Sequence, residues 1–284
     1  MATPEEKVIE LPKKRLVRPP LHIACYGGAG ARKTTFFATM PQPIVIACFD
    51  AVGKDTPYWE LGDVQEAKKT KLGIARRQVL NGKKQRVAVI EYYHDPLVDN
   101  PVAAAAFLER LNKLHDEVQA GDVGTFCLET VTSGNLTTRK MYQYDLIPGA
   151  KDPRKWYAGA TDVLEEILMI QLPALACNVC VGLHMSKTKV ESENTKESGA
   201  VQMVRAPLLP GRLMDSFSAQ WPEIYRAYIG RNEEGQRVGL LQTRTDERYE
   251  AASQIRAPDP CPGNYQALWE VWDKRQARRQ AKQK

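Results

Sequence analysis

The stretch CYGGAGARKTTF, residues 25–36, decides the fold expected for this chain. From Gly27 to Thr34 it follows the pattern Gly-x-x-x-x-Gly-Lys-Thr, except that Arg32 stands where the pattern has its second glycine. The apolar run LHIACY (21–26) precedes the stretch, and TTFFATM (34–40), which can open a helix, continues it. A strand before the loop and a helix after it are the context in which this pattern binds phosphate groups.

The chemistry of such a loop gives a role to most of its residues. Its glycines let backbone N–H groups approach phosphates, its lysine reaches the β- and γ-phosphates, and its hydroxyl holds Mg²⁺. The helix N-terminus adds positive potential. We therefore expect ATP and Mg²⁺ as cofactors, with Thr34 as a metal ligand. The expected nucleotide-binding residues are Gly27, Gly28, Gly30, Arg32, Lys33, Thr34 and Thr35.

Arg32 is the departure from the pattern. If the loop needs a positive φ there, arginine costs about 1 kcal/mol relative to glycine. Its side chain can crowd the nucleotide, point outward, or add a cation beside the phosphates. A glycine-rich turn in an inactive descendant is the alternative interpretation of the whole stretch.

Outward from this loop, continuous apolar runs alternate with helical patterns. The expected strands are IVIACFD (44–50), VAVIEYY (87–93), GTFCLET (124–130) and NVCVGLH (178–184), and the expected helices are 102–119 and 160–172. Apolar strands separated by helices indicate a parallel sheet covered on both faces. The runs 224–230 and 238–245 indicate an antiparallel hairpin. The expected fold is α/β, with a mostly parallel central sheet flanked by helices and a C-terminal antiparallel hairpin.

The composition is that of an ordinary globular protein, with 43% hydrophobic and 26% charged residues. No apolar run approaches the ~20 residues that span a bilayer, and the N-terminus lacks the apolar stretch of a signal peptide. We therefore expect a cytoplasmic protein without a membrane partner. The six cysteines suit buried, reduced thiols. The pair Cys177-x-x-Cys180 has no second ligand pair, so core cysteines are favoured over a metal site.

The positive charge is concentrated at one end. The segment KRQARRQAKQK (274–284) carries six basic residues and no acidic one, and residues 1–273 are electrically balanced. Such a tail suits nucleic acid or another polyanion. A solubilising, frayed helix end is the alternative.

In order and spacing these segments resemble the RecA-like P-loop ATPases, and most closely the phage-encoded recombination ATPases linked to single-strand annealing. The segments that carry the resemblance are the loop 25–36, MPQPIVIACFD (40–50), FCLETVTS (126–133), VCVGLH (179–184), APLLPGRL (206–213) and the hairpin 224–245. The resemblance implies a RecA-like core at 21–260, a flexible N-terminal arm at 1–20, and a C-terminal helix with a basic tail at 261–284.

The resemblance implies further site residues. Glu129 stands where the family has an acid, usually aspartate, that helps to hold Mg²⁺, and His184 stands where a polar sensor feels the γ-phosphate. Val52 stands where the family has the glutamate that activates water, and valine cannot orient water or accept a proton. Asp50 and Asp55 are the carboxylates that remain nearby, so we expect binding to be retained better than hydrolysis. The expected catalytic residues are Lys33, Glu129, Asp50 and His184.

The resemblance also implies a surface for single-stranded DNA. In the family, the loops after the fourth and fifth strands bind DNA, and here these would be 134–160 and 185–206. The first combines cations for phosphates with aromatic faces for bases. Alternatively, Trp156 and Tyr157 cap a hydrophobic core. The expected nucleic-acid contacts are Arg139, Lys140, Arg154, Lys155, Trp156, Lys187 and Lys189.

The function that the resemblance implies is ATP binding and hydrolysis coupled to single-stranded DNA, in phage recombination or annealing. The resemblance further implies a homo-oligomeric ring or filament that works with other phage recombination or replication proteins in the host cytoplasm. Two other functions stay open. One is a degenerate P-loop nucleotide-binding protein with a structural or regulatory role in a DNA-processing complex, and the other is a motor or loader for a helicase.

Overall fold

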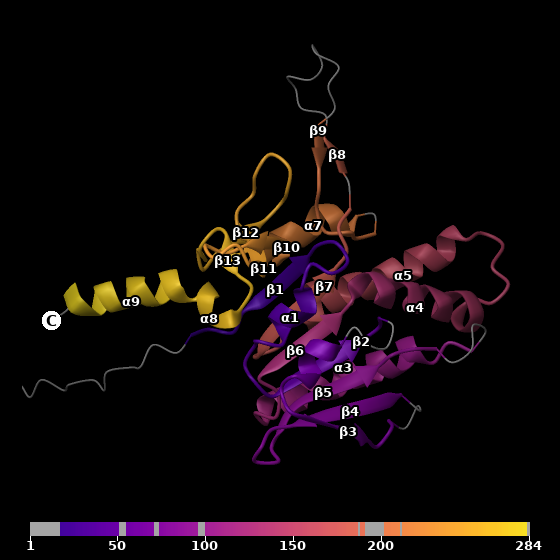
Figure 1. Cartoon of the computed structure of the whole chain (residues 1–284). Coiled ribbons are helices and arrows are strands. Elements are labelled where there is room, and N and C mark those ends of the chain that lie inside the picture. The colour runs from indigo at the N-terminus through magenta and orange to yellow at the C-terminus, as the bar shows by residue number, and fades with distance from the viewer. Residues whose placement is uncertain are drawn as a thin grey trace, which may run out of the picture.

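The computed structural model describes residues 18–50, 55–70, 74–95, 100–186, 188–190, 202–210 and 212–282. Strands and helices alternate along most of the chain (Figure 1). The strands are β1 (His22–Tyr26), β2 (Ile44–Cys48), β3 (Asp63–Ala67), β4 (Ala75–Leu80), β5 (Arg86–Tyr92), β6 (Thr125–Glu129), β7 (Asn178–Leu183), β8 (Thr188–Val190), β9 (Gln202–Val204), β10 (Glu223–Arg231), β11 (Arg237–Gln242), β12 (Ala252–Ser253) and β13 (Cys261–Pro262). The helices are α1 (Lys33–Phe37), α2 (Thr56–Trp59), α3 (Ala103–Gln119), α4 (Val131–Met141), α5 (Arg154–Glu166), α7 (Leu213–Gln220), α8 (Tyr265–Leu268) and α9 (Glu270–Lys282), with π-helical turns η1 (Tyr142–Leu146) and η2 (Ile167–Gln171).

Within the described residues, one sheet of eleven strands runs through the molecule in the order β13-β11-β10-β1-β7-β6-β2-β5-β4-β3, with β12 pairing beside β10. The strands from β10 to β5 are mutually parallel. The strands at both rims are antiparallel. One strand, β7, separates β1, which leads into the glycine-rich loop, from β6, which ends in Glu129.

The expected α/β fold with a mostly parallel sheet and a closing hairpin is therefore confirmed. The hairpin β10–β11 is joined to the parallel core because β10 pairs in parallel with β1, with Ile23 opposite Glu223. A second hairpin, β3–β4, extends the other rim and was not predicted from the sequence. Its strands are mostly polar, and Val79 is the residue of the hairpin that is fully buried, so the apolar pattern of a strand is missing.

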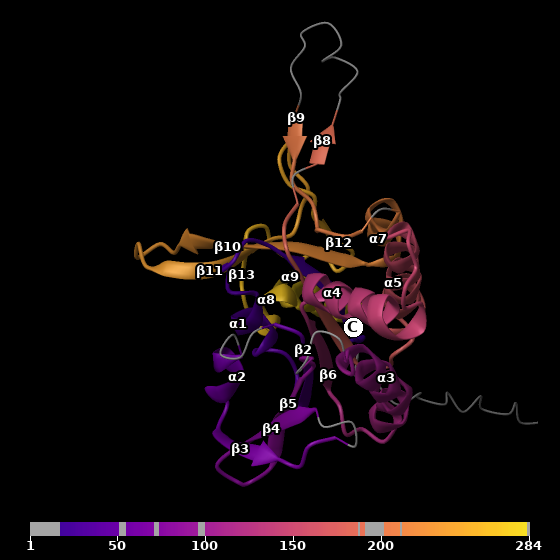
Figure 2. The same cartoon turned by 90° about the vertical axis from the view of Figure 1, so that its right-hand side faces the viewer.

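Helices cover both faces of the sheet, as the continuous apolar strands predicted. Side chains alternate between the faces along each strand. Ala24 and Tyr26 of β1 pack into the cluster with α3 and α5, whereas Ile23 and Cys25 pack into the cluster with α1 and α8. Figure 2 shows α3, α4 and α5 on one side of the sheet and α1 and α2 on the other.

The expected DNA-binding loop 134–160 is helical, so the prediction of a loop there is wrong. The chain runs through α4 and η1 and, after a short turn, into α5. Thr130 begins α4, because its side chain accepts a hydrogen bond from the backbone N–H of Ser133. The resemblance implied a loop here, but tertiary packing stabilises helices in this segment despite its glycine and β-branched residues. The helix expected at 160–172 likewise begins earlier, at Arg154.

All six cysteines are free and buried, which agrees with the predicted core thiols. Among the described residues, no helix has the length and apolar character needed to cross a membrane. Most of the expected N-terminal arm, 1–17, lies outside the described residues. Arg18 pairs with Asp273 of α9.

Candidate nucleotide-binding site

The loop between β1 and α1 lies at the carboxyl end of the parallel strands, where open α/β sheets place their ligands. The loop passes so close to β10 that a Cβ at Gly27 would lie 2.5 Å from the carbonyl oxygen of Ala227. Gly30 has a φ of 72°, which L-residues with side chains rarely adopt. Two of the glycines in the loop, Gly27 and Gly30, are thus required by its path.

Arg32 occupies the left-handed region, with φ 63° and ψ 29°, directly before α1. The loop therefore does require a positive φ at this position, and arginine pays a conformational free-energy cost there that glycine would not. Its exposed side chain lies over Gly239 of β11, since a Cβ built there would be 3.3 Å from both Cβ and Cδ of Arg32. Arg32 also lines the edge of the cavity described below.

Lys33 folds back over the loop. Its Nζ donates to the carbonyl oxygens of Gly27 at 3.1 Å and Gly28 at 3.2 Å. These neutral carbonyls are weaker partners for an ammonium than a phosphate would be, because hydrogen bonds between charged groups are the stronger ones. A phosphate in the loop would therefore compete well for Lys33.

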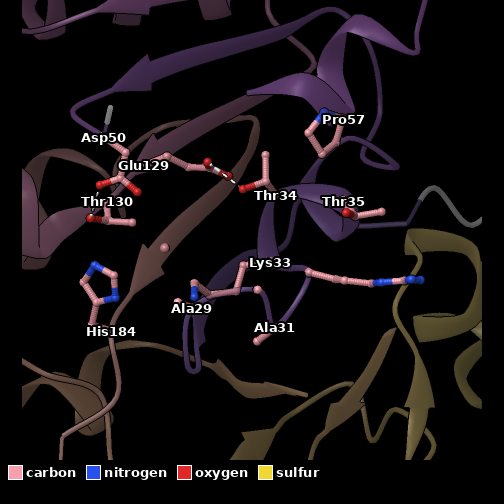
Figure 3. A pocket seen from close by; sticks show the side chains of 13 residues that line it. Ala29, Ala31, Lys33, Thr34, Thr35, Asp50, Pro57, Glu129, Thr130 and His184 are labelled. Carbon is pink, nitrogen blue, oxygen red and sulfur yellow. Dashed lines mark hydrogen bonds between the residues drawn. The ribbon is translucent and has the colours of Figure 1, made fainter. Parts of the chain in front are cut away.

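Glu129, at the end of β6, is bonded through both of its carboxylate oxygens. Thr34 donates to Oε2 at 2.9 Å and Tyr58 of α2 donates to Oε1 at 3.0 Å. Figure 3 shows Glu129 and Thr34 pointing toward each other. Burial raises the pKa of Glu129 to about 7, although the hydrogen bonds from Thr34 and Tyr58 and the charge of Lys33 act in the opposite direction. The two residues predicted to share a metal are thus in direct contact.

These two residues suit Mg²⁺, which prefers oxygen ligands and keeps several waters while it binds one or two carboxylates and substrate phosphates. Within the described part of the chain, no group of three or more His, Cys, Asp or Glu residues is arranged to hold a metal. Mg²⁺ would therefore need phosphate oxygens in addition to Thr34 and Glu129. When bound, it would neutralise phosphate charge.

Asp50 and His184 reach the same cavity from the ends of β2 and β7. Oδ1 of Asp50 accepts hydrogen bonds from Thr130 at 3.1 Å and from Ser133 at 2.6 Å. The half-buried ring of His184 lies near Thr130 (Figure 3). The first turn of α4 thus fixes the carboxylate of Asp50, which allows Asp50 to face bound ligand in a defined orientation.

Together these groups surround a cavity of about 290 Å³. It is lined by Ala29, Gly30, Ala31, Arg32, Lys33, Thr34, Thr35, Asp50, Pro57, Glu129, Thr130, Gly182 and His184. The structure thus brings together all four expected catalytic residues. Gly27 and Gly28 contribute through the carbonyls that hold Lys33.

Tyr58, Thr130 and Ser133 are site residues that the sequence did not predict. Thr130 and Ser133 follow the strand that ends in Glu129, so their proximity was available from the sequence. Tyr58 lies in a short helix for which no motif gives a signal. Val52 lies outside the described residues. Asp55 is buried and accepts hydrogen bonds from Trp59 at 3.0 Å and from Tyr92, so it is held beneath α2 and does not line the cavity.

The expected nucleic-acid residues lie on helices or at the limits of the described chain. Arg139 and Lys140 end α4, and Arg154, Lys155 and Trp156 begin α5. Arg139 stacks over Tyr157 at 4.8 Å, and Arg154 pairs with Asp152 at 2.9 Å. Trp156 is half-buried, but Tyr157 is exposed, so the two do not together cap a core as the alternative interpretation had it. Lys189 belongs to β8, and Lys187 lies outside the described residues.

The chain has distant likenesses among solved structures. No protein-family model matches the chain, and no curated protein matches it. A KaiC-like protein from the hyperthermophilic archaeon Pyrococcus horikoshii OT3 is 13% identical over 84% of this chain and 85% of that chain, with a TM-score of 0.36. A prototypical ATPase of the type III secretion system of pathogenic bacteria is 12% identical over 76% of this chain and 53% of that one, with a TM-score of 0.37.

The Legionella pneumophila ATPase DotB is 8% identical over 84% of this chain and 50% of that one, with a TM-score of 0.28. The chain therefore spans about half the length of the last two proteins. The assignment of the fold rests on the strand order and on the position of the loop 27–34 within it.

Proposed function

We propose that this protein binds Mg²⁺ and ATP in the cavity beside residues 27–34 and hydrolyses ATP slowly. The observation that carries the proposal is the convergence of Lys33, Thr34 and Glu129 at the carboxyl end of the parallel strands. Lys33 supplies a cation for the phosphates, and Thr34 and Glu129 supply adjacent oxygens for the metal. The N-terminus of α1 faces the same space, and its N–H groups favour anions.

Hydrolysis needs a group that orients the attacking water, and Asp50 is the carboxylate best placed to do so. It lines the cavity together with His184, while Asp55 is held elsewhere by Trp59 and Tyr92. Because phosphoryl transfer depends mainly on positioning and charge stabilisation, replacement of the usual glutamate favours slow rather than absent turnover.

The finer proposal is that ATP binding is coupled to single-stranded DNA in phage recombination or annealing, within a homo-oligomeric ring or filament. The stacked pair of Arg139 and Tyr157 supports a nucleic-acid contact on the helical hairpin α4–α5, since it joins a cation to an exposed aromatic face. The sequence resemblance described above supports the recombination role, the oligomer, the cytoplasmic location and the phage partners.

The second candidate is a nucleotide-binding protein that has lost turnover and acts as a regulatory or structural component. Two observations favour it. Arg32 holds a strained left-handed backbone conformation in the loop, and burial keeps Glu129 half protonated near pH 7. A protonated Glu129 cannot neutralise a metal, which lowers both metal-dependent affinity and turnover, whereas Lys33 remains to bind the phosphates.

Isothermal titration of ATP with Mg²⁺ tests the binding proposal. The wild-type protein and Lys68→Ala, which removes an exposed lysine on the far rim of the sheet, are expected to bind equally well. Lys33→Ala is expected to abolish binding. Equal ATP affinity in Lys33→Ala would refute the assignment of the loop.

Steady-state hydrolysis with and without oligo(dT) then separates the two candidate functions, with Lys33→Ala as the blank. A hydrolysis rate that exceeds the blank and rises when DNA is added supports the DNA-coupled ATPase. Nucleotide binding without turnover supports the regulatory protein.

A further inference from the structure

A second cavity, of about 560 Å³, lies between α9 and the segment 254–256. The residues that line it are Gln254, Ile255, Arg256, Trp272, Arg275, Gln276, Arg278 and Arg279. Four of them are exposed arginines. We call this feature the arginine groove. It lies on the side of the β13 rim, from which α8 and α9 continue, and α9 projects from the body there (Figure 1).

Within the part of the chain that the structure describes, no carboxylate pairs with the positive charges of the groove. The acidic residues of α9 lie in its first turn, where Asp273 pairs with Arg18 and Glu270 pairs with Lys274. Among the described residues, none of the four arginines forms an ion pair with a carboxylate. The sequence contains no acidic residue after Asp273. Clustered like charges repel one another, so an anion in the groove would relieve this repulsion.

The geometry of the groove suits an extended anion better than a single ion. Trp272, Arg275, Gln276 and Arg279 recur at helical spacing, so they share one face of α9. Arg256 stands on the opposite wall, on a backbone with a φ of 57° that turns the segment at this point. Arg275 and Arg279 are separated by one helical turn, or about 6 Å along the axis. Two walls of cations spaced in this way can contact successive groups of one chain.

The side-chain chemistry points to nucleic acid rather than to an acidic peptide. Arginine presents a planar fork that matches phosphate oxygens, and here arginines rather than lysines line the groove. Trp272 is half-buried and held edge-to-face by Trp269, with ring centroids 5.2 Å apart. A rigid indole at the wall of a cationic groove offers a surface on which a base can stack.

We infer that the arginine groove binds single-stranded nucleic acid, with phosphates on Arg256, Arg275, Arg278 and Arg279 and a base against Trp272. This inference rests on the nucleic-acid role in the proposed function, but it places the contact on α9 and not on the α4–α5 hairpin. The basic C-terminal segment then acts as one wall of a binding surface rather than as a loose tether.

The experiment measures the anisotropy of labelled oligo(dT) with nucleotide-free protein across a range of salt concentrations. The groove variant is R275A/R278A/R279A. The matched control is K68A/K83A/R86A, which removes the same charge from exposed positions toward the β3 rim. Thermal unfolding of both variants checks that each remains folded. A labelled abasic oligonucleotide of the same length reports the part of binding that requires bases.

The groove variant is expected to bind oligo(dT) about 100-fold more weakly at about 0.1 M salt than the control, with a salt slope smaller by about 2, if each lost arginine neutralises one phosphate. The wild-type protein is expected to bind oligo(dT) more tightly than the abasic strand. Equal salt slopes for the groove variant and the control would overturn the inference. Equal affinity of the wild-type protein for oligo(dT) and for the abasic strand would also overturn it. Competition by polyglutamate as strong as by oligo(dT) would also overturn it, because the groove would then be a general site for acidic chains.

Failure of this inference is distinguishable from failure of the proposed function. Lys33→Ala is expected to leave nucleotide-free oligo(dT) binding unchanged, because Lys33 is not part of the groove. The variant R139A/K140A tests the α4–α5 surface in the same assay. If R139A/K140A loses DNA binding and the groove variant keeps it, the inference about the arginine groove is wrong and the proposed function remains supported.

Discussion

The phenolic hydroxyl of Tyr58 donates a 3.0 Å hydrogen bond to Oε1 of Glu129, while Thr34 donates to the other oxygen of the same carboxylate. Tyr58 is fully buried, and it comes from a short helix between β2 and β3 rather than from the loop 27–34. Both hydrogen bonds favour the ionised form of Glu129, against the effect of burial. Tyr58 is therefore a positioning residue for the acid that would hold the metal.

Tyr58→Phe is expected to shift the pH dependence of ATP binding. Without the phenolic donor, the pKa of Glu129 rises further above its present value of about 7. The pH at which Mg²⁺-dependent ATP affinity falls to half should therefore rise, which titrations between pH 6 and pH 9 measure. Tyr93→Phe is the matched control, because Tyr93 donates to buried Glu91 at 2.8 Å in the other core cluster. Identical profiles for the two variants would remove Tyr58 from the metal site.

Glu129→Gln is expected to change how stability depends on pH. The folded protein holds a proton on Glu129 up to about pH 7, whereas the unfolded chain releases it near 4.5. The free energy of unfolding of the wild type therefore falls as the pH rises through this window, by up to about 3 kcal/mol. Glutamine does not titrate, so the variant should gain stability relative to wild type between pH 5 and pH 8. Urea unfolding at pH 5 and pH 8 tests this. If the difference in free energy of unfolding between variant and wild type is the same at both pH values, Glu129 ionises normally.

The parallel part of the sheet was predictable from the sequence because strands buried on both faces consist of continuous apolar residues. The loop motif also placed Thr34 directly after the first strand, whereas Glu129 was implied only by the resemblance. The carboxyl ends of β1, β2, β6 and β7 lie side by side, so residues that end these strands meet even though they are far apart in the chain.

Other features depend on tertiary structure and left no local pattern. Tyr58 reaches Glu129 across the sheet face, and α4 forms from residues of poor helix propensity because it packs against α3 and α5. The arginine groove was visible in the sequence only as a basic tail. Its second wall comes from Arg256, and no spacing rule connects that residue with α9.

Replacing Arg32 separates the backbone strain from the role of its guanidinium group. The free energy of unfolding of Arg32→Gly should exceed that of Arg32→Ala by about 1 kcal/mol. Both variants lose the long side chain, but only glycine adopts φ 63° freely. Urea unfolding measures the difference. ATP affinity should be at least as high in Arg32→Gly as in the wild type, since the glycine restores the usual loop. Equal stability of the two variants would mean that the loop relaxes away from the left-handed conformation.

Asp50 and Asp55 can be separated as candidates for orienting the water. Asp50 lines the cavity and accepts hydrogen bonds from Thr130 and Ser133, whereas Asp55 accepts from Trp59 and Tyr92 and lies outside the lining. Asp50→Asn keeps the shape and the acceptor oxygen but removes the base, so it should lower the hydrolysis rate on the order of 100-fold or more while ATP affinity stays within a few-fold.

Asp55→Asn should instead lower stability, through loss of charge from buried hydrogen bonds, and leave the turnover of the folded protein near the wild-type value. Single-turnover hydrolysis at saturating ATP measures the chemical step directly for both variants. Loss of turnover in Asp55→Asn with normal turnover in Asp50→Asn would reverse the assignment, and α2 would then have to move toward the cavity when ATP binds.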